Sequence, residues 1–178
     1  GTGWYRQDSW FGKPWIWCIL QSFGNRVDIY GGLPQIFTNY NKMINSPEKG
    51  NIQGMGIMTE GMDFNPVVYE LVLDMMWGDG VQDLDAWKEY YLTCRYGKDI
   101  PESVRQAWDI LFEECYTKSQ LINMTQLCFT PGFTQIPDTS VVKLYQAWEL
   151  MQRCAYHLGH CSSYPVSLHT HGREEMAH

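Results

Sequence analysis

Glu60 is the side chain of this sequence whose setting is best suited to chemistry. It stands in GMGIMTEGMDFNPVVYE, residues 54–70, between a short apolar run and a predicted helix start, and the sequence has no Lys or Arg within ten residues of it. In a barrel of parallel strands, a residue just past the carboxyl end of a strand lines the mouth in which active sites form. A carboxylate there can attack a sugar carbon, hold a metal or move a proton. The alternative is a carboxylate that only caps or ion-pairs with a local group.

Other constellations in the sequence are weaker. Asp63 follows Glu60 by three residues, but two carboxylates on one tight loop cannot readily flank a bond across about 5 Å, so we assign Asp63 to the approach to the next helix. The stretch GNIQGMG, residues 50–56, lacks the Lys and the spacing of a phosphate-binding loop, which argues against nucleotide binding. The C-terminal tail contains side chains that can bind zinc but no framework to hold them, so we predict neither a metal site nor a cofactor; these are His157, His160, Cys161, His169 and His171.

Composition excludes several classes of partner. The net charge of −7 is spread evenly along the chain, so there is no basic face for nucleic acid or an anionic membrane. No signal peptide is recognisable, and no apolar run approaches the roughly 18 residues of a membrane span, so we expect any targeting signal to lie outside this sequence. Six Cys without a C-x-x-C pair leave the redox compartment open. The sequon Asn123-Met124-Thr125 matters only in a secretory context.

Two strands are predicted before Glu60. Residues 14–20, PWIWCIL, form an apolar run rich in aromatic and β-branched types, which is typical of a strand buried on both faces in a parallel sheet. Residues 25–50 read as loop with one short helix near residues 33–43. Residues 55–58 form a second apolar run that ends at a polar stop. Glu60 is therefore predicted on a loop at the end of a strand.

A helix is predicted directly after this loop. Asn65 can cap free backbone N–H groups with its side-chain oxygen, and Pro66 stands at the first helical position, where no N–H is missed. Apolar residues follow at helical spacing, and the helix closes near Trp77. We expect this helix to pack back on the sheet.

From residue 81 onward the pattern is helical alone. Three amphipathic helices are predicted, at residues 84–96 with Gly97 as the stop, at residues 101–116, and from Asp138 or Thr139 onward. Their apolar faces are predicted to carry Trp87, Tyr90, Tyr91 and Cys94, then Trp108, Leu111, Phe112 and Cys115, then Leu144, Trp148 and Met151. The last 22 residues hold all five His and show neither helical nor strand periodicity.

Three blocks together resemble glycoside hydrolase family 89, the alpha-N-acetylglucosaminidases. They are GKPWIWCIL (12–20) with Phe23-Gly24 after it, GMGIMTEGMDFNPVVYELVLDMMW (54–77) and DLDAWKEYYLTCRYG (83–97). The resemblance covers about residues 1–157. It implies an α/β plus all-α fold in which residues 1–80 are the C-terminal portion of a (β/α)8 barrel and residues 81–157 begin an α-helical domain, which leaves residues 158–178 as an irregular or disordered tail.

The resemblance also implies an activity. It is retaining hydrolysis of terminal α-linked N-acetylglucosamine, with heparan sulfate as the animal substrate, in the lysosome or outside the cell, and the full-length protein could be a homo-oligomer. In the family the Glu of the G-x-x-x-E-G block is the nucleophile, which here is Glu60. The W-C-x-L segment lies at the pocket, so Trp17, Cys18 and Leu20 are candidate sugar contacts. Their other interpretation is as buried strand residues.

Three features set this chain apart from a complete enzyme. The second carboxyl group of a retaining glycosidase comes in the family from an earlier barrel strand that is missing here, so we expect an internal fragment that is inactive alone. Gln21-Ser22-Phe23-Gly24-Asn25 replaces the usual His-Asn-Phe-Gly-Gly, which leaves substrate preference open. Beyond about Tyr156 the family continues into further helices, whereas this chain diverges. The rival hypotheses are a non-catalytic piece that binds carbohydrate or a partner through Trp and Tyr platforms, and the non-functional product of a damaged gene.

Overall fold

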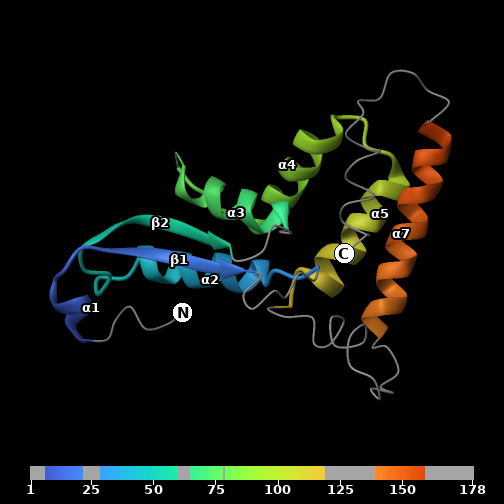
Figure 1. The fold of residues 1–178 in the computed structure, drawn as a ribbon. Helices are drawn as coiled ribbons and strands as arrows, with labels where there is room; N and C mark the ends of the chain where they lie inside the picture. Colours follow the sequence, from blue (N-terminus) through green and yellow to red (C-terminus); the bar gives the residue numbers. More distant parts are fainter. Residues whose placement is uncertain (1–6, 22–28, 60–64, 78, 119–138, 159–178) are drawn as a thin grey trace, which may run out of the picture.

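The computed structural model describes residues 7–21, 29–59, 65–77, 79–118 and 139–158 (Figure 1). A strand-containing part comes first and a helical part follows. The elements in chain order are α1 (Gln7–Phe11), β1 (Trp15–Gln21), α2 (Leu33–Ile44), β2 (Ile52–Thr59), α3 (Pro66–Met76), α4 (Leu84–Tyr96), α5 (Glu102–Ile110), the π-helix η2 (Leu111–Cys115) and α7 (Thr139–Leu158). Each of the described helices is too short or too polar to cross a bilayer.

The two strands form a parallel pair joined by α2. Trp17 lies opposite Met55, Cys18 opposite Gly56 and Gln21 opposite Thr59. Parallel strands need a crossover connection of this kind, and their carboxyl ends meet at one edge of the sheet. The prediction of parallel strands around residues 14–20 and 55–58 is confirmed, as is the short helix between them. The tail and the loop that carries Glu60 lie outside the described residues.

The expectation that the first strand is buried on both faces is wrong. Trp17, Ile19 and Gln21 are 6%, 7% and 4% exposed, whereas Ile16 and Leu20 are 57% and 51% exposed. The reason is that helices cover one face only, where the Trp17 ring meets the Tyr40 ring of α2 edge-on with centroids 5.9 Å apart. The opposite face, which we call the bare face, carries Ile16, Cys18 and Leu20 of β1 and, through the strand register, Gly54, Gly56 and Met58 of β2.

Helix α3 begins at Pro66 as predicted, but Asn65 does not act as the sequence suggests. None of the described amides of the helix donates a capping hydrogen bond to the Asn65 side chain. Its Oδ1 instead accepts a hydrogen bond from the hydroxyl of Tyr116, at 3.3 Å. The hydrogen bond to Tyr116 therefore replaces the expected cap on the helix. The inner face of α3 supplies Val67, Val68, Leu71, Val72 and Met75 to the core.

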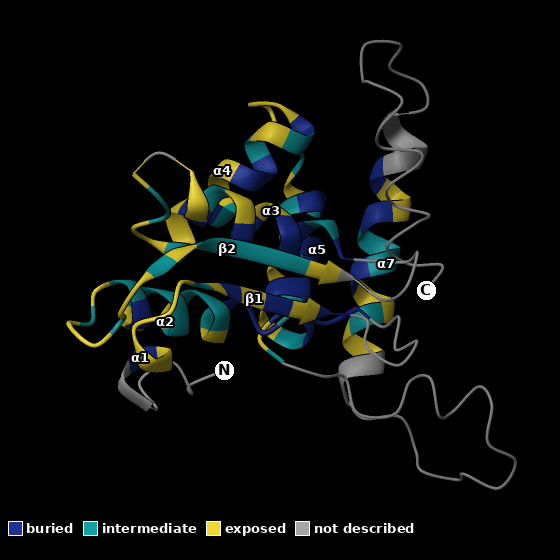
Figure 2. Cartoon of the chain, turned by 60° about the vertical axis from the view of Figure 1, so that its left-hand side comes forward, coloured by how far each residue is buried: buried dark blue, intermediate teal, exposed yellow. Residues whose placement is uncertain are grey.

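Helix α4 leads from α3 into the helical part, and the two are tied by the Trp87 indole, which donates to Asp74 Oδ2 at 2.8 Å. The predicted apolar face of α4 is correct only in part. Tyr90 is 58% exposed and Cys94 is exposed too, while the buried positions are Trp87, Tyr91, Leu92 and Tyr96. The reason is that the buried residues of α4 follow the i, i+4 spacing from Trp87, which leaves Tyr90 and Cys94 outside a narrow stripe. Figure 2 shows both buried and exposed residues on this helix.

The centre of the helical part is an aromatic cluster on α4, α5 and η2. The ring of Trp108 lies 5.2 Å from the rings of both Tyr91 and Phe112, and its Nε1 donates to the Tyr96 hydroxyl at 2.9 Å. At Leu111 the helix widens into η2, whose last bond runs from the Tyr116 amide to the Leu111 carbonyl at 2.9 Å. The predicted core positions of residues 101–116 are all buried. Helix α7 packs against α5 along its length and buries Ala147, Met151 and Cys154 (Figure 1).

Candidate active site

The carboxyl ends of β1 and β2 define the edge at which a site is expected. Gln21 and Thr59 lie opposite each other there, and the buried Gln21 amide donates from Nε2 to the Tyr30 carbonyl at 2.8 Å. Glu60 follows Thr59 directly in the sequence but lies outside the described residues, so its predicted role stays a prediction. Met58, two residues earlier, is 58% exposed on the bare face.

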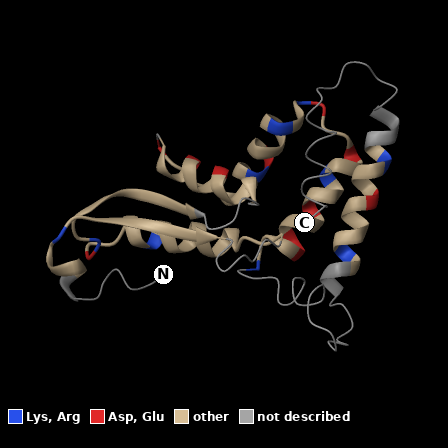
Figure 3. Cartoon of the chain, viewed as in Figure 1, with Lys and Arg blue, Asp and Glu red and all other residues tan. Residues whose placement is uncertain are grey.

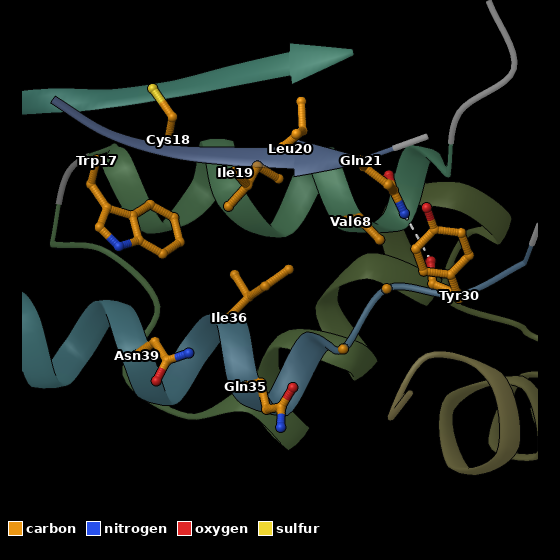
Figure 4. A pocket seen from close by; sticks show the side chains of 12 residues that line it. Trp17, Cys18, Ile19, Leu20, Gln21, Tyr30, Gln35, Ile36, Asn39 and Val68 are labelled. Carbon is orange, nitrogen blue, oxygen red and sulfur yellow. Dashed lines mark hydrogen bonds between the residues drawn. The ribbon is translucent and has the colours of Figure 1, made fainter. Parts of the chain in front are cut away.

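A cavity of about 360 Å³ lies between β1 and α2 (Figure 4). The predicted sugar contacts Trp17, Cys18 and Leu20 all belong to the strand segment that lines it. Their side chains diverge, because successive residues of a strand point to opposite faces. Trp17 points toward α2, whereas Cys18 and Leu20 point away from it (Figure 4). The structure therefore brings the three residues to one strand and one cavity but not to one surface.

The polar groups of this cavity are neutral. Trp17 Nε1 and Gln21 Oε1 are buried and have no hydrogen-bond partner among the described residues. The amides of Gln35 and Asn39, one helical turn apart on α2, also line the cavity. Burial raises the pKa of the Tyr40 phenol beside Trp17, which keeps that group uncharged. Such a lining suits neutral donors and acceptors, such as hydroxyl and amide groups.

The amides on α2 are functional candidates that the sequence reasoning missed. Their signal was available, because Gln35 and Asn39 are polar residues at an i, i+4 spacing within the predicted short helix. Gln21 was noted only as a departure from the family pattern. Its burial at the end of β1 and its bond to Tyr30 depend on the tertiary fold.

Charge is absent from the strands themselves. Neither β1 nor β2 contains Asp, Glu, Lys or Arg, and the charged residues of the described part lie on the helices and connections (Figure 3). Within the described part of the chain, no three His, Cys, Asp or Glu side chains come together as metal ligands would. A carboxylate added at the carboxyl-end edge would thus have no charged neighbour on either strand.

Comparison with known proteins finds sequence similarity over the strand-containing part of the chain. Residues 2–79 match the sequence model of the alpha-N-acetylglucosaminidase (NAGLU) tim-barrel domain. The predicted family resemblance is confirmed. Over 115 residues, which are 64% of this chain, the sequence is 33% identical to human alpha-N-acetylglucosaminidase. The chain spans 15% of the length of that relative. The family match extends over β1, α2, β2 and α3, and Trp17, Cys18, Leu20 and Glu60 all fall within it.

Proposed function

We propose that this chain supplies the nucleophile-bearing part of the barrel of a retaining alpha-N-acetylglucosaminidase. The match of residues 2–79 to the barrel domain of that family carries the proposal. The parallel pair β1–β2 supports it, because Glu60 follows directly on the carboxyl end of β2, the side on which barrel enzymes build their sites. The proposed substrate is a glycan that ends in α-linked N-acetylglucosamine, such as heparan sulfate, and the proposed location is lysosomal or secreted.

Glu60 is the proposed nucleophile of a two-step displacement. Its carboxylate attacks the anomeric carbon, the glycosidic bond breaks, and the departing oxygen takes the electron pair and a proton from a second carboxylic acid. Water then attacks the glycosyl ester, the second carboxylate accepts the water proton, and Glu60 leaves as a carboxylate. By the resemblance, we propose that an earlier strand of the barrel carries the second carboxyl group. We therefore propose that the chain alone does not hydrolyse glycosides.

The bare face of the sheet is the proposed inner wall of the barrel. In a (β/α)8 barrel the helices cover the outside, so the face without helices points inward. Cys18 stands on that face in the middle of β1 and Leu20 near its carboxyl end, which makes them the proposed sugar contacts. Trp17 lies on the helix side, where we propose that it supports the strand and lines the cavity beside α2.

A chimera tests the proposal. Residues 2–118 of this chain replace the corresponding segment of human alpha-N-acetylglucosaminidase, and hydrolysis of an aryl α-N-acetylglucosaminide is measured. The chimera is expected to be active, and Glu60→Gln to lower kcat by about 1,000-fold or more while binding of N-acetylglucosamine is kept. Glu48→Gln is the matched control, because Glu48 is an exposed carboxylate in the same matched segment. A folded chimera whose activity survives Glu60→Gln would rule out the assignment and favour a binding role.

A further inference from the structure

Tyr116 stands where the helical part meets the strand-containing part. It follows η2 and is 1% exposed, and its ring lies nearly parallel to that of Trp108, with centroids 6.3 Å apart. Its carbonyl accepts a hydrogen bond from the Leu33 amide at 2.8 Å, at the start of α2. Its hydroxyl donates to Asn65 Oδ1 at 3.3 Å. Tyr116 thus connects the aromatic cluster to the start of α2 through its backbone carbonyl and to the start of α3 through its side-chain hydroxyl.

Asn65 is the first described residue after residues 60–64, which include Glu60. It is 7% exposed, and its carbonyl accepts the first hydrogen bond of α3 from the Val68 amide at 3.0 Å. Its side-chain oxygen is directed to Tyr116, 51 residues away in the sequence, rather than to the amides of its own helix. The position of this end of the segment therefore depends on the helical part of the molecule.

The residues just before α2 are also bound to the segment around Tyr116. The Gly31 amide donates to the Lys118 carbonyl at 3.1 Å. A Cβ on Gly31 would lie 2.5 Å from Val68 Cγ2 and 3.3 Å from Tyr116 Cδ1, so the backbone approaches both side chains as closely as only glycine allows. The neighbouring Tyr30 carbonyl holds Gln21 at the end of β1. Tyr116 therefore lies beside Gly31 and Asn65, which belong to the described ends of the two connections that leave the carboxyl-end edge.

We infer that Tyr116 is a positioning residue that acts through Asn65 on the segment from Glu60 to Asn65. One end of this segment is set by Thr59, which pairs with Gln21, and the other by the Tyr116–Asn65 hydrogen bond. The inference rests on the proposed role of Glu60 as nucleophile. A displacement of about 1 Å in a reacting group can cost on the order of 100-fold in rate, so the anchor of such a segment matters to catalysis.

Hydrogen exchange of the full chain tests the anchor itself. Tyr116→Phe removes the hydroxyl and keeps the ring, and is expected to raise deuterium uptake in peptides that cover residues 60–68 while peptides from α4 exchange as in the wild type. Tyr145→Phe is the matched control, because Tyr145 is 57% exposed on α7. A rise spread evenly over all peptides would indicate a merely structural role and overturn the inference, as would unchanged uptake in residues 60–68.

Asn65→Ala tests the route from the other side. This variant is expected to raise deuterium uptake in residues 60–68 to the same extent as Tyr116→Phe. The double variant should raise uptake no further, because both substitutions remove the same hydrogen bond. Effects of the two variants that simply add would refute the route through Asn65.

The chimera described above supplies the catalytic readout. Tyr116→Phe is expected to lower kcat by about 10-fold with KM changed less than about 2-fold, because the nucleophile is misplaced while sugar binding is kept. An active chimera whose kcat is unaffected by Tyr116→Phe overturns the inference. An inactive chimera whose exchange pattern still changes as expected would instead count against the proposed function alone.

Discussion

Cys18 and Gly56 lie opposite each other across the parallel strands, and the thiol occupies the space that a side chain at residue 56 would need. A Cβ on Gly56 would stand 2.8 Å from Cys18 Sγ, whereas one on Gly54, two residues earlier on the same face, would meet nothing within 4 Å among the described atoms. The two glycines therefore differ in what they do. Gly56 makes room for a neighbour, and Gly54 only leaves the bare face flat.

Gly56→Ala is expected to destabilise the full chain by about 1–3 kcal/mol, because the strands must shift or the Cys18 side chain must leave its position. Gly54→Ala, the matched control, should change the free energy of unfolding by less than about 0.5 kcal/mol. Chemical denaturation measures both. The double variant Cys18→Ala/Gly56→Ala should recover most of the loss, and a double variant no more stable than Gly56→Ala would show that the contact is not the cause.

The Tyr96 hydroxyl accepts a hydrogen bond from the buried Trp108 Nε1 at 2.9 Å. This nitrogen is the one polar atom of the Trp108 side chain. Tyr96→Phe is expected to cost about 1–3 kcal/mol, because the indole N–H is left buried without its acceptor. Tyr90→Phe on the same helix serves as control, since Tyr90 is 58% exposed. The prediction fails if thermal denaturation gives equal midpoints for the two variants.

Burial raises the pKa of the Cys115 thiol from 9.0 to about 11. The native state then keeps a proton that the unfolded state releases above pH 9, so the contribution of Cys115 to stability is complete below pH 9 and declines as the pH rises toward about 11. The loss is expected to be on the order of 2 kcal/mol. Urea denaturation of wild type and Cys115→Ala between pH 8 and about pH 10.5 measures it, and the pH dependence should be steeper for the wild type.

Thiol labelling provides an independent check on Cys115. At pH 8 a thiol reagent should modify the exposed Cys18 and Cys94 of the native chain well before Cys115, which reacts only as the chain unfolds. Comparable native-state labelling of Cys115 and Cys18 would contradict both its burial and its raised pKa.

Leu20 and Ile16 test the proposed inner wall. Both are exposed on the bare face, at 51% and 57%, but Leu20 stands near the carboxyl end of β1 and Ile16 near the amino end. In the chimera, Leu20→Ala is expected to raise KM by about 3- to 10-fold by removing an apolar contact with the sugar, while Ile16→Ala leaves KM unchanged. Equal effects of the two substitutions on KM would argue against a sugar contact at Leu20.

Much of the fold could be predicted from the sequence because the deciding signals are local. The apolar run of residues 14–20 and the Pro66 helix start each lie within a few residues of the structure that they specify, and both elements appear where they were predicted. The candidate site was accessible in the same way, through a short block of residues that resembles a family and matches its barrel domain. Local pattern could not tell whether one or both faces of β1 would be covered.

By itself, then, the sequence determined the order of strands and helices, the parallel crossover and the resemblance of residues 2–79 to the alpha-N-acetylglucosaminidase barrel domain. Only the tertiary structure decided that Trp17 and Leu20 point to opposite sides of a half-covered sheet, and that Asn65 bonds to Tyr116 instead of capping its own helix. The physical reason is the distance along the chain over which each kind of signal acts. Periodicity and helix starts act between neighbours in the chain, whereas burial and a hydrogen bond across 51 residues depend on which surfaces the folded chain brings together.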